Sequence, residues 1–275
     1  MSIIDKKKIA HSFGLAANTY DSVAHFQRWI GAKLIRKIPE SAPGTIVDLG
    51  CGTGYFSEVL KNKFPDANYI GMDLSDDMVN FAKAHHSSEC AWLAGDAESL
   101  PFKSNSIDLV FSSLAIQWCS NLALLMKEVE RVLSPNGCFV FSTLLDGSLE
   151  ELKVAWSEVD DKQHVNDFFL KEDYRQAMIE SALDIRVLSE ETKVLKYQKL
   201  TALMRELKCL GAHNLNEERS TALMGKKKLS GVVSAYEKFR VDEGYLPASY
   251  EVLWGVVMSK KSGAENTAIE SVEMR

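Results

Sequence analysis

Hydrophobic and polar positions alternate along residues 45–145 in a pattern that predicts strands separated by helices. Short apolar runs typical of buried strands occupy 45–50, 68–75, 90–96, 106–115 and 138–145. Amphipathic stretches with apolar residues at helical spacing occupy 55–64, 76–86 and 122–133, and Ser75 is a plausible helix N-cap. Alternation of this kind predicts a parallel sheet with helices on both faces and right-handed crossovers.

The pattern changes after Leu145. Residues 146–183 and 198–242 are mostly helical by periodicity, whereas 185–197 and 249–260 have strand character and would complete a seven-stranded sheet. The predicted fold class is therefore α/β, Rossmann-like, with a mostly parallel sheet, helices on both faces and a helical cap from late insertions. Residues 146–260 would hold the rest of the sheet with the cap, and 261–275 would form a disordered tail.

Composition narrows the possible functions. The chain has 275 residues and a net charge of −6, which opposes broad binding to nucleic acid or to an anionic membrane. The five cysteines are scattered and form no C-x-x-C pair, so we expect buried thiols in a reducing cytoplasm and no metal site. The N-terminus lacks the apolar core of a signal peptide, and no apolar run is long enough for a membrane span.

The stretch "TIVDLGCGTG" places a glycine-rich loop directly after the first predicted strand. In open parallel sheets, ligands bind beyond the carboxyl ends of the strands, and glycines there let backbone approach a ligand. The spacing of Gly50, Gly52 and Gly54 is G-x-G-x-G, which differs from the dinucleotide pattern G-x-G-x-x-G. Asp48, just before the loop, disfavours phosphate and suits a positively charged or donor group such as an α-amino group.

Two further acids follow strand ends. Asp73 ends the second strand, where a carboxylate can accept both hydroxyls of a ribose, and Asp96 ends the third, where it could meet the exocyclic amine of an adenine beside Ala97. Taken singly, the glycines could be a turn, Asp73 a helix cap and Asp96 an ordinary loop acid. Together, in register at successive strand ends, they favour a nucleoside that carries an amino acid and lacks phosphates.

Residues 45–145 resemble the class I S-adenosylmethionine-dependent methyltransferases. The similarity is carried by "VDLGCGTGYFSEVL", "YIGMDLSDDMV", "GDAESLPF", "SIDLVFSSLAIQWCSN" and "EVERVLSPNGCFVFST". It implies S-adenosylmethionine as cofactor and S-adenosylhomocysteine as product. The implied cofactor-binding residues lie at the methionine moiety, the ribose and the adenine, and near the fourth strand: Asp48, Gly50, Cys51, Gly52, Gly54, Asp73, Leu74, Met78, Asp96, Ala97 and Leu114. For Met78, plain core packing is the commoner role of such a residue.

A closer resemblance spans nearly the whole chain except its tail. "SFGLAANTYDSVAHFQ", "LAIQWCSN", "GSLEEL" and "LKCLGAHNLNEER" are similar to the malonyl-acyl-carrier-protein O-methyltransferases of biotin synthesis, although the last departs from the family in the order of its polar residues. This resemblance implies methylation of the free carboxylate of a malonyl thioester on acyl-carrier protein. It also implies that residues 1–44 form a helical lid over the cofactor core.

The expected acceptor-side residues follow from these motifs. Tyr20 could hydrogen-bond the cofactor's carboxylate, Gln117 and Trp118 could wall the methyl-transfer site, and Arg219 could orient the malonyl carboxylate. Tyr20 could equally be a helix anchor, Trp118 a packed core residue, and Arg219 a partner in a surface ion pair. No general base is expected, because a carboxyl group with a pKa of about 4 is already ionised at neutral pH.

Other functions stay open at this level. A methyltransferase for a quinone-like small molecule would need a base that "AIQWCSN" does not offer, and a protein that binds S-adenosylmethionine without turnover would keep the same cofactor site. The G-x-G-x-G spacing argues against a nucleotide-dependent dehydrogenase. An acidic carrier protein would require a local basic patch, for which Lys226–Lys228 and Lys6–Lys8 are candidates.

Overall fold

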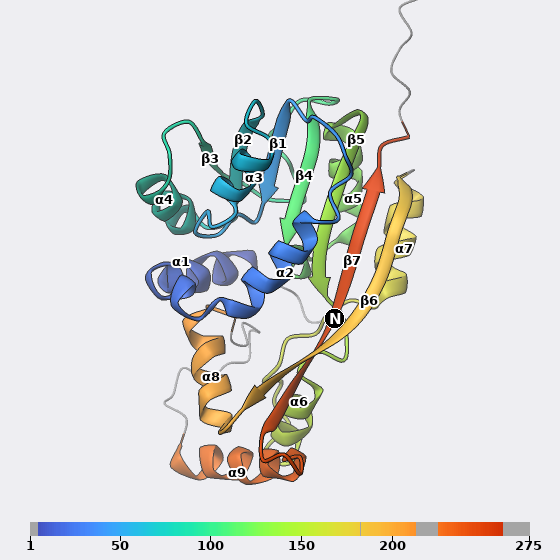
Figure 1. The fold of residues 1–275 in the computed structure, drawn as a ribbon. Helices are drawn as coiled ribbons and strands as arrows, with labels where there is room; N and C mark the ends of the chain where they lie inside the picture. The colour runs from blue at the N-terminus through green and yellow to red at the C-terminus, as the bar shows by residue number, and fades with distance from the viewer. Residues whose placement is uncertain (1–4, 182, 213–224, 261–275) are drawn as a thin grey trace, which may run out of the picture.

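The computed structural model describes residues 5–181, 183–212 and 225–260, and Figure 1 shows their arrangement. Seven strands form one sheet in the order β3-β2-β1-β4-β5-β7-β6. The strands are β1 (Thr45–Leu49), β2 (Asn68–Asp73), β3 (Ala91–Ala94), β4 (Ile107–Ser113), β5 (Leu133–Leu144), β6 (Asp184–Tyr197) and β7 (Leu246–Met258). The first five strands run parallel, and β7 is antiparallel to both β5 and β6. The predicted mostly parallel seven-stranded sheet is confirmed.

Two details of the sheet were not evident from the sequence. β5 begins at Leu133, so the stretch "SPNG" at 134–137 belongs to the strand, and an irregularity in its register against β4 absorbs the extra residues. Asn136 takes a positive φ of 63° there. The last strand in the chain, β7, lies between β5 and β6 and pairs with both.

Helices cover both faces of the sheet, as the alternating pattern predicts. One hydrophobic cluster joins the sheet to α2 (His25–Ile35) and α3 (Ser57–Lys63), and a second joins it to α5 (Leu122–Val132) and α7 (Lys171–Glu180). α5 shows why the sequence folds this way. It buries a stripe of apolar residues at helical spacing: Leu122, Leu125, Met126, Val129 and Val132. α4 (Asp76–His85) packs beside β2 and β3, and the predicted cap at Ser75 accepts the N–H of Met78.

A second lobe is built on the far end of the two longest strands. β6 and β7 continue beyond the other strands, and α6 (Glu150–Ser157), α8 (Leu200–Cys209) and α9 (Lys226–Tyr236) gather around that extension (Figure 1). The hydrophobic cluster at α2 and α3 runs on into this lobe through Trp156, Leu203 and Tyr236. Residues 146–183 are less helical than their periodicity predicts, because 158–170 contains no helix between α6 and α7.

The N-terminal helix α1 (Lys6–Val23) lies across the carboxyl ends of the parallel strands (Figure 1). It packs against α4 on one side and α8 on the other. Ser12 donates to the carbonyl of Gly211 at 3.0 Å, and Thr19 donates to the carbonyl of Cys209 at 3.0 Å. α1 therefore bridges the sheet and the second lobe at the edge where the glycine loop lies.

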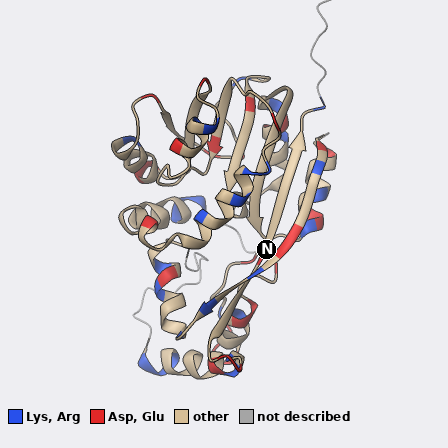
Figure 2. Cartoon of the chain, viewed as in Figure 1, with Lys and Arg blue, Asp and Glu red and all other residues tan. Residues whose placement is uncertain are grey.

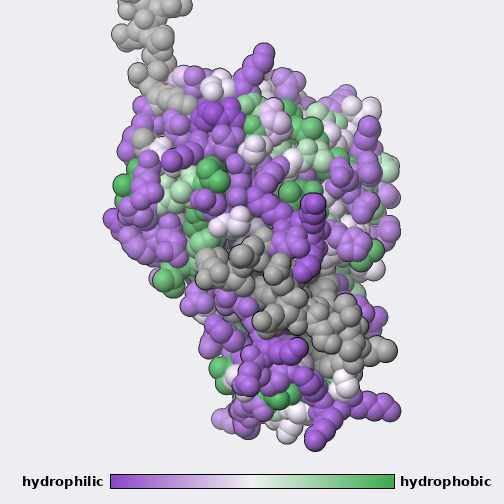
Figure 3. Space-filling view, turned by 180° about the vertical axis from the view of Figure 1, so that it is seen from behind, coloured by the Kyte–Doolittle hydropathy of each residue, from purple (hydrophilic) through white to green (hydrophobic). Residues whose placement is uncertain are grey.

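The face of the molecule opposite to that of Figure 1 is mostly polar. Seen from behind, the molecule is mainly hydrophilic, with hydrophobic residues in small separate areas (Figure 3). Among the helices of the described residues, none combines the length and the apolar character needed to cross a bilayer.

Candidate functional site

The glycine loop is tied to the second strand at the carboxyl edge of the sheet. The N–H groups of Gly50 and Cys51 donate to the carbonyl of Met72 at 2.7 and 3.0 Å, and the N–H of Gly52 donates to the carboxylate of Asp73 at 2.9 Å. The structure thus brings the loop and the second acid of the predicted set into direct contact. These bonds join the ends of β1 and β2 into one rigid edge.

The three glycines serve different purposes. All have positive φ, of 76°, 55° and 82° for Gly50, Gly52 and Gly54, where L side chains are strained. A Cβ on Gly50 would lie 2.1 Å from the Cβ of Ala115, and one on Gly54 would lie 2.6 Å from the ring of Trp92. A Cβ on Gly52 would meet nothing within 4 Å. The first and last glycines therefore make room for protein, and only Gly52 faces space that a ligand could fill.

Asp48 lies inside the sheet beneath the loop and is 2% exposed. It accepts a hydrogen bond from the hydroxyl of Tyr69 at 2.7 Å. Burial raises the pKa of Asp48 to about 7, although the Tyr69 hydrogen bond acts in the opposite direction. A carboxyl with this pKa is partly protonated at neutral pH. Asp48 therefore supports the loop as a buried polar group and does not supply a full negative charge at the carboxyl edge of the sheet.

Asp73 is held in a fixed orientation at the end of β2. Its Oδ2 accepts the N–H of Gly52, and its Oδ1 accepts the N–H of Ser75 at 2.8 Å. Burial raises the pKa of Asp73, and these backbone donors oppose that rise. The N–H of Leu74 also acts on this carboxylate and lowers its pKa, and the acceptor capacity that remains can receive a hydroxyl group of a sugar. Leu74 follows it, half-buried, while Met78 is buried at 1% exposure in α4.

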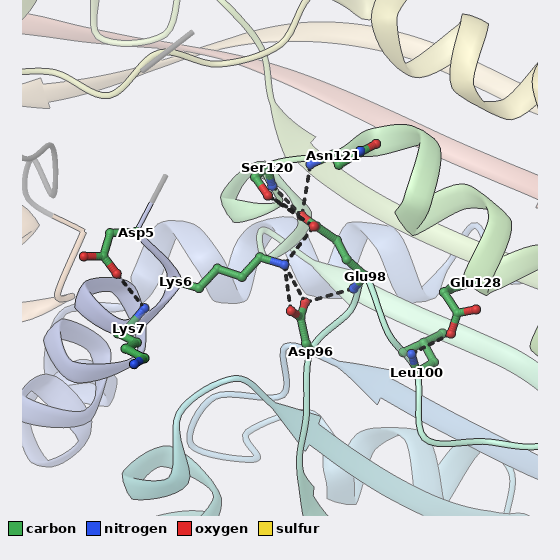
Figure 4. A network of polar contacts seen from close by, with 9 residues as sticks. All are labelled: Asp5, Lys6, Lys7, Asp96, Glu98, Leu100, Ser120, Asn121 and Glu128. Atoms are coloured by element: carbon green, nitrogen blue, oxygen red, sulfur yellow. Dashed lines mark hydrogen bonds and ion pairs between the residues drawn. The ribbon is translucent and has the colours of Figure 1, made fainter. Parts of the chain in front are cut away.

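Asp96 follows β3 and is engaged by α1 (Figure 4). The ammonium group of Lys6 donates to both carboxylate oxygens of Asp96, at 2.9 and 2.7 Å, and pairs with Glu98 at 2.8 Å. Ala97 lies between the two acids and is half-buried. The sequence reasoning considered Asp96 but missed Glu98, whose only signal was its position two residues further along the same loop.

The loop after β4 is held in an unusual conformation. Leu114 has a φ of 52°, and its carbonyl accepts the side-chain amide of Gln117 at 2.7 Å. The other end of that amide accepts a long bond, 3.4 Å, from Thr143, whose hydroxyl lies 2.9 Å from the hydroxyl of Tyr174. Gln117 is 6% exposed and so points into this buried chain of polar groups. Thr143 and Tyr174 were not singled out by sequence, because each lies in an apolar periodic pattern.

The N-terminal segment reaches the same edge from the other side. The aromatic ring of Phe13 packs edge-on against Trp118, with centroids 5.3 Å apart. Burial raises the pKa of Tyr20, and the nearby negative charge of Asp73 raises it further. Asp21 accepts the hydroxyl of Thr53 in the glycine loop at 3.0 Å. The structure therefore brings Tyr20 and Trp118 to the carboxyl edge of the sheet, where the glycine loop also lies.

Arg28 is a rim residue that sequence reasoning missed. It bonds the carbonyl of Asp21, forms an ion pair with its carboxylate at 3.8 Å, and lies over the ring of Tyr55 with 4.7 Å to the centroid. Its Nε is buried and has no hydrogen-bond partner within the described part of the chain. A guanidinium with a free donor beside the glycine loop suits a carboxylate ligand.

The second lobe carries a separate polar group. Asp160 accepts hydrogen bonds from His164 at 2.7 Å and from Lys228 at 2.5 Å, and His164 stacks on Trp156 with centroids 3.7 Å apart. Burial acts to raise the pKa of Asp160, yet hydrogen bonds from Lys228 and His164 lower it to about 2. Arg219, the predicted orienting residue, lies outside the described residues.

These features fit a phosphate-free nucleoside with a positively charged group. Gly52 leaves open space, and Asp73 offers acceptor capacity beside it at the end of β2. Within the ranges that the structure describes, three or more His, Cys, Asp or Glu side chains nowhere gather as a metal site would require.

Comparison with known proteins extends this picture. A family model described as a methyltransferase domain matches residues 47–141. The malonyl-[acyl-carrier protein] O-methyltransferase of Hahella chejuensis is 41% identical over 250 residues, covering 90% of this chain and 89% of that protein. The biotin biosynthesis bifunctional protein BioHC of Cellvibrio japonicus is 43% identical over 255 residues, which is 92% of this chain. The chain spans about half the length of that bifunctional relative, 50%.

The solved structures match at the level of fold. The crystal structure of protein BH2331 from Bacillus halodurans superposes with a TM-score of 0.60 at 17% identity, covering 84% of this chain and 98% of that one. This likeness places the sheet and its flanking helices in the same architecture.

Proposed function

The chain belongs to the malonyl-[acyl-carrier protein] O-methyltransferase family, and on that premise we propose that it methylates the free carboxylate of malonyl-acyl-carrier protein with S-adenosylmethionine. The product would be the malonyl methyl ester, and the name of the Cellvibrio japonicus relative, a biotin biosynthesis protein, supports a use of this ester in biotin synthesis.

The extent of the similarity carries this proposal. The methyltransferase-domain model ends at residue 141, whereas the Hahella relative is similar over 90% of the chain. The cofactor core is shared by enzymes with many acceptors, so it does not identify a substrate. The similarity continues through α1 and the second lobe, which would enclose the acceptor. It therefore favours the acceptor named for the Hahella relative, malonyl-acyl-carrier protein.

The residues of the carboxyl edge would hold the cofactor as follows. Asp73 would accept the ribose hydroxyls, the backbone at Gly52 would approach the methionine moiety, and Asp96 would accept the adenine amine. Arg28 and Tyr20, on the N-terminal segment, would meet the cofactor's carboxylate. When bound, S-adenosylmethionine supplies a methyl group on a positively charged sulfur. The protein's task is to bind it, keep water away and present its methyl group to the acceptor.

The acceptor needs alignment more than activation. A malonyl carboxylate is ionised at neutral pH, because ordinary carboxyl pKa values lie near 4. The side chains at the rim therefore need not remove a proton. Holding the two reacting groups within reach in a closed site can lower the barrier by about 7–11 kcal/mol at best. The side chain of Gln117 holds the turn at Leu114 by a hydrogen bond. Trp118, packed against Phe13, would form one wall of the methyl-transfer site next to this turn.

The carrier protein is the proposed partner, and it would need a basic surface. Two of the lysines considered for docking are used within the protein, since Lys6 pairs with Asp96 and Lys228 pairs with Asp160. Lys226 and Lys227 are exposed at the start of α9, where Figure 2 shows basic residues at one end of the helix. We propose this end of α9 as the docking surface for an acidic carrier protein.

One labelling experiment tests the function. Purified protein is incubated with methyl-labelled S-adenosylmethionine and either malonyl-carrier protein or acetyl-carrier protein, which lacks the free carboxylate. The expected result is that only the malonyl-carrier protein becomes labelled and that it carries the label as a methyl ester. Cofactor binding without transfer to either would indicate a protein that binds S-adenosylmethionine without turnover, and transfer to a quinone-like acceptor instead would indicate a small-molecule methyltransferase.

A further inference from the structure

Lys6 connects the N-terminal helix to the loop after β3 with all of its donors. Its ammonium group has three N–H bonds. Two point to the carboxylate oxygens of Asp96, at 2.9 and 2.7 Å, and the third points to Oε2 of Glu98 at 2.8 Å (Figure 4). Lys6 lies 90 positions from Asp96 in the chain. Since its donors are fully used, Lys6 is placed to orient other groups and not to bind a ligand itself.

The two acids depend on Lys6 to different degrees. Glu98 also accepts the N–H and hydroxyl of Ser120 and the N–H of Asn121, the last at 3.0 Å. Among the residues that the structure describes, the Asp96 carboxylate otherwise receives only a local bond, from the N–H of Glu98 to its Oδ1 at 2.9 Å. Oδ1 therefore has both acceptor positions occupied, while Oδ2 accepts from Lys6 and keeps a second position. Removing Lys6 would release Asp96 and leave Glu98 anchored.

The interactions of Lys6 with Asp96 and Glu98 also join three segments that border the proposed cofactor site. Lys6 belongs to α1, Asp96 and Glu98 to the loop after β3, and Ser120 and Asn121 to the turn that precedes α5. The side chain of Lys6 is 26% exposed, that of Asp96 36% and that of Glu98 7%. An ion pair in this partly exposed setting is sensitive to salt but still directional.

We propose that Lys6 is a positioning residue of the adenine subsite: it sets the orientation of Asp96 so that Oδ2 can accept the adenine amine, and it holds the first turn of α1 over that end of the cofactor. This inference rests on the proposed function, because it assumes that Asp96 faces the adenine. It predicts that cofactor affinity depends on a residue that makes no contact with the cofactor.

The test is the affinity for S-adenosylhomocysteine of K6M and of the matched control K7M, measured by titration calorimetry at low and high sodium chloride. Lys7 is the exposed neighbour on the same helical turn. K6M should bind about fivefold more weakly than wild type at low salt, the effect of losing a partly screened ion pair. Wild type and K7M should weaken as salt rises, whereas K6M should respond little. K6R, which keeps a cation with several donors, should recover most of the affinity.

The possible outcomes distinguish a failure of the proposed role of Lys6 from a failure of the proposed methyltransferase function. Wild-type binding together with unchanged or tighter binding by K6M overturns the role of Lys6, as does a K7M variant that behaves like K6M. Failure of the wild type to bind S-adenosylhomocysteine overturns the proposed function and this inference with it. Melting temperatures of the unliganded variants add a control, because a purely structural Lys6 would lower the melting temperature of K6M and leave its salt response like that of wild type.

Discussion

Replacing Asp73 with asparagine tests the centre of the proposed cofactor site. Both carboxylate oxygens accept backbone donors, from Gly52 at 2.9 Å and from Ser75 at 2.8 Å. An asparagine of the same shape keeps one acceptor oxygen and replaces the other with an amide group that can only donate. Whichever way the amide turns, one backbone N–H faces another donor, and one sugar hydroxyl loses its acceptor.

The expected loss of affinity follows from these contacts. A hydrogen bond to a charged group contributes about 1.5–3 kcal/mol, so losing one at the ribose should raise the dissociation constant by about 10- to 150-fold. The unliganded protein should change less. An unpaired buried N–H destabilises it by about 1–3 kcal/mol, but replacing the carboxylate with a neutral amide also removes the cost of burying a charge, the same cost that raises the pKa of Asp73.

Titration with S-adenosylhomocysteine measures the affinity, and urea unfolding of the unliganded protein measures the stability. Asp76→Asn is the matched control, since Asp76 is exposed in the first turn of the neighbouring helix α4. An Asp73→Asn protein that binds within about twofold of wild type would refute the assignment of Asp73 to the ribose, whatever its stability.

Three further changes probe the edge of the sheet. Both Gly52→Ala and Gly54→Ala should cost about 1–2 kcal/mol of backbone strain, because both residues have positive φ. Gly54→Ala should lower the free energy of unfolding by about a further 1–3 kcal/mol, because the new Cβ overlaps the rings of Trp92 and His86, whereas Gly52→Ala, with open space at its Cβ, should mainly weaken S-adenosylhomocysteine binding; equal unfolding losses would contradict this contrast. Tyr174→Phe should lower the free energy of unfolding by about 1 kcal/mol and reduce methyl transfer at saturating substrates, with unchanged cofactor affinity. Full turnover would show that the hydrogen bond of Tyr174 to Thr143, and through it to Gln117, does not matter for methyl transfer. The raised pKa of Asp48, about 7 against 3.8, means that the folded protein binds more protons between these values, so this group's contribution to stability falls as pH rises from 4 to 7. Asp48→Asn should remove that decline in urea titrations at pH 4.5 and 7.5, and an unaltered pH slope would show that other groups cause it.

Local patterns predicted much of the fold correctly because each depends on near neighbours in the chain. The stripe of α5 and the N-cap at Ser75 are properties of a few consecutive residues, and both are found as predicted. The position of β7 between β5 and β6 could not be read in this way. Strand order depends on which long-range pairings bury the most surface, and two adjacent antiparallel partners look the same in sequence in either order.

The glycine loop shows a similar division. Its position after β1 was evident from the sequence, and so were the acids at the ends of β2 and β3. The purpose of each glycine was not, because the neighbours of Gly50 and Gly54 are Ala115 and Trp92, which are distant in the chain.

The sequence by itself determined the alternating elements, the glycine loop and the order of acids along the strand ends, since these follow from periodicity and from backbone requirements at single positions. Only the tertiary structure decided that Asp48 is a buried support, that Tyr174 is linked to Gln117 through Thr143, and that Lys6 binds Asp96. The physical reason is that hydrogen bonds and ion pairs act over about 3 Å in space, and folding alone brings residues from separate segments within that range.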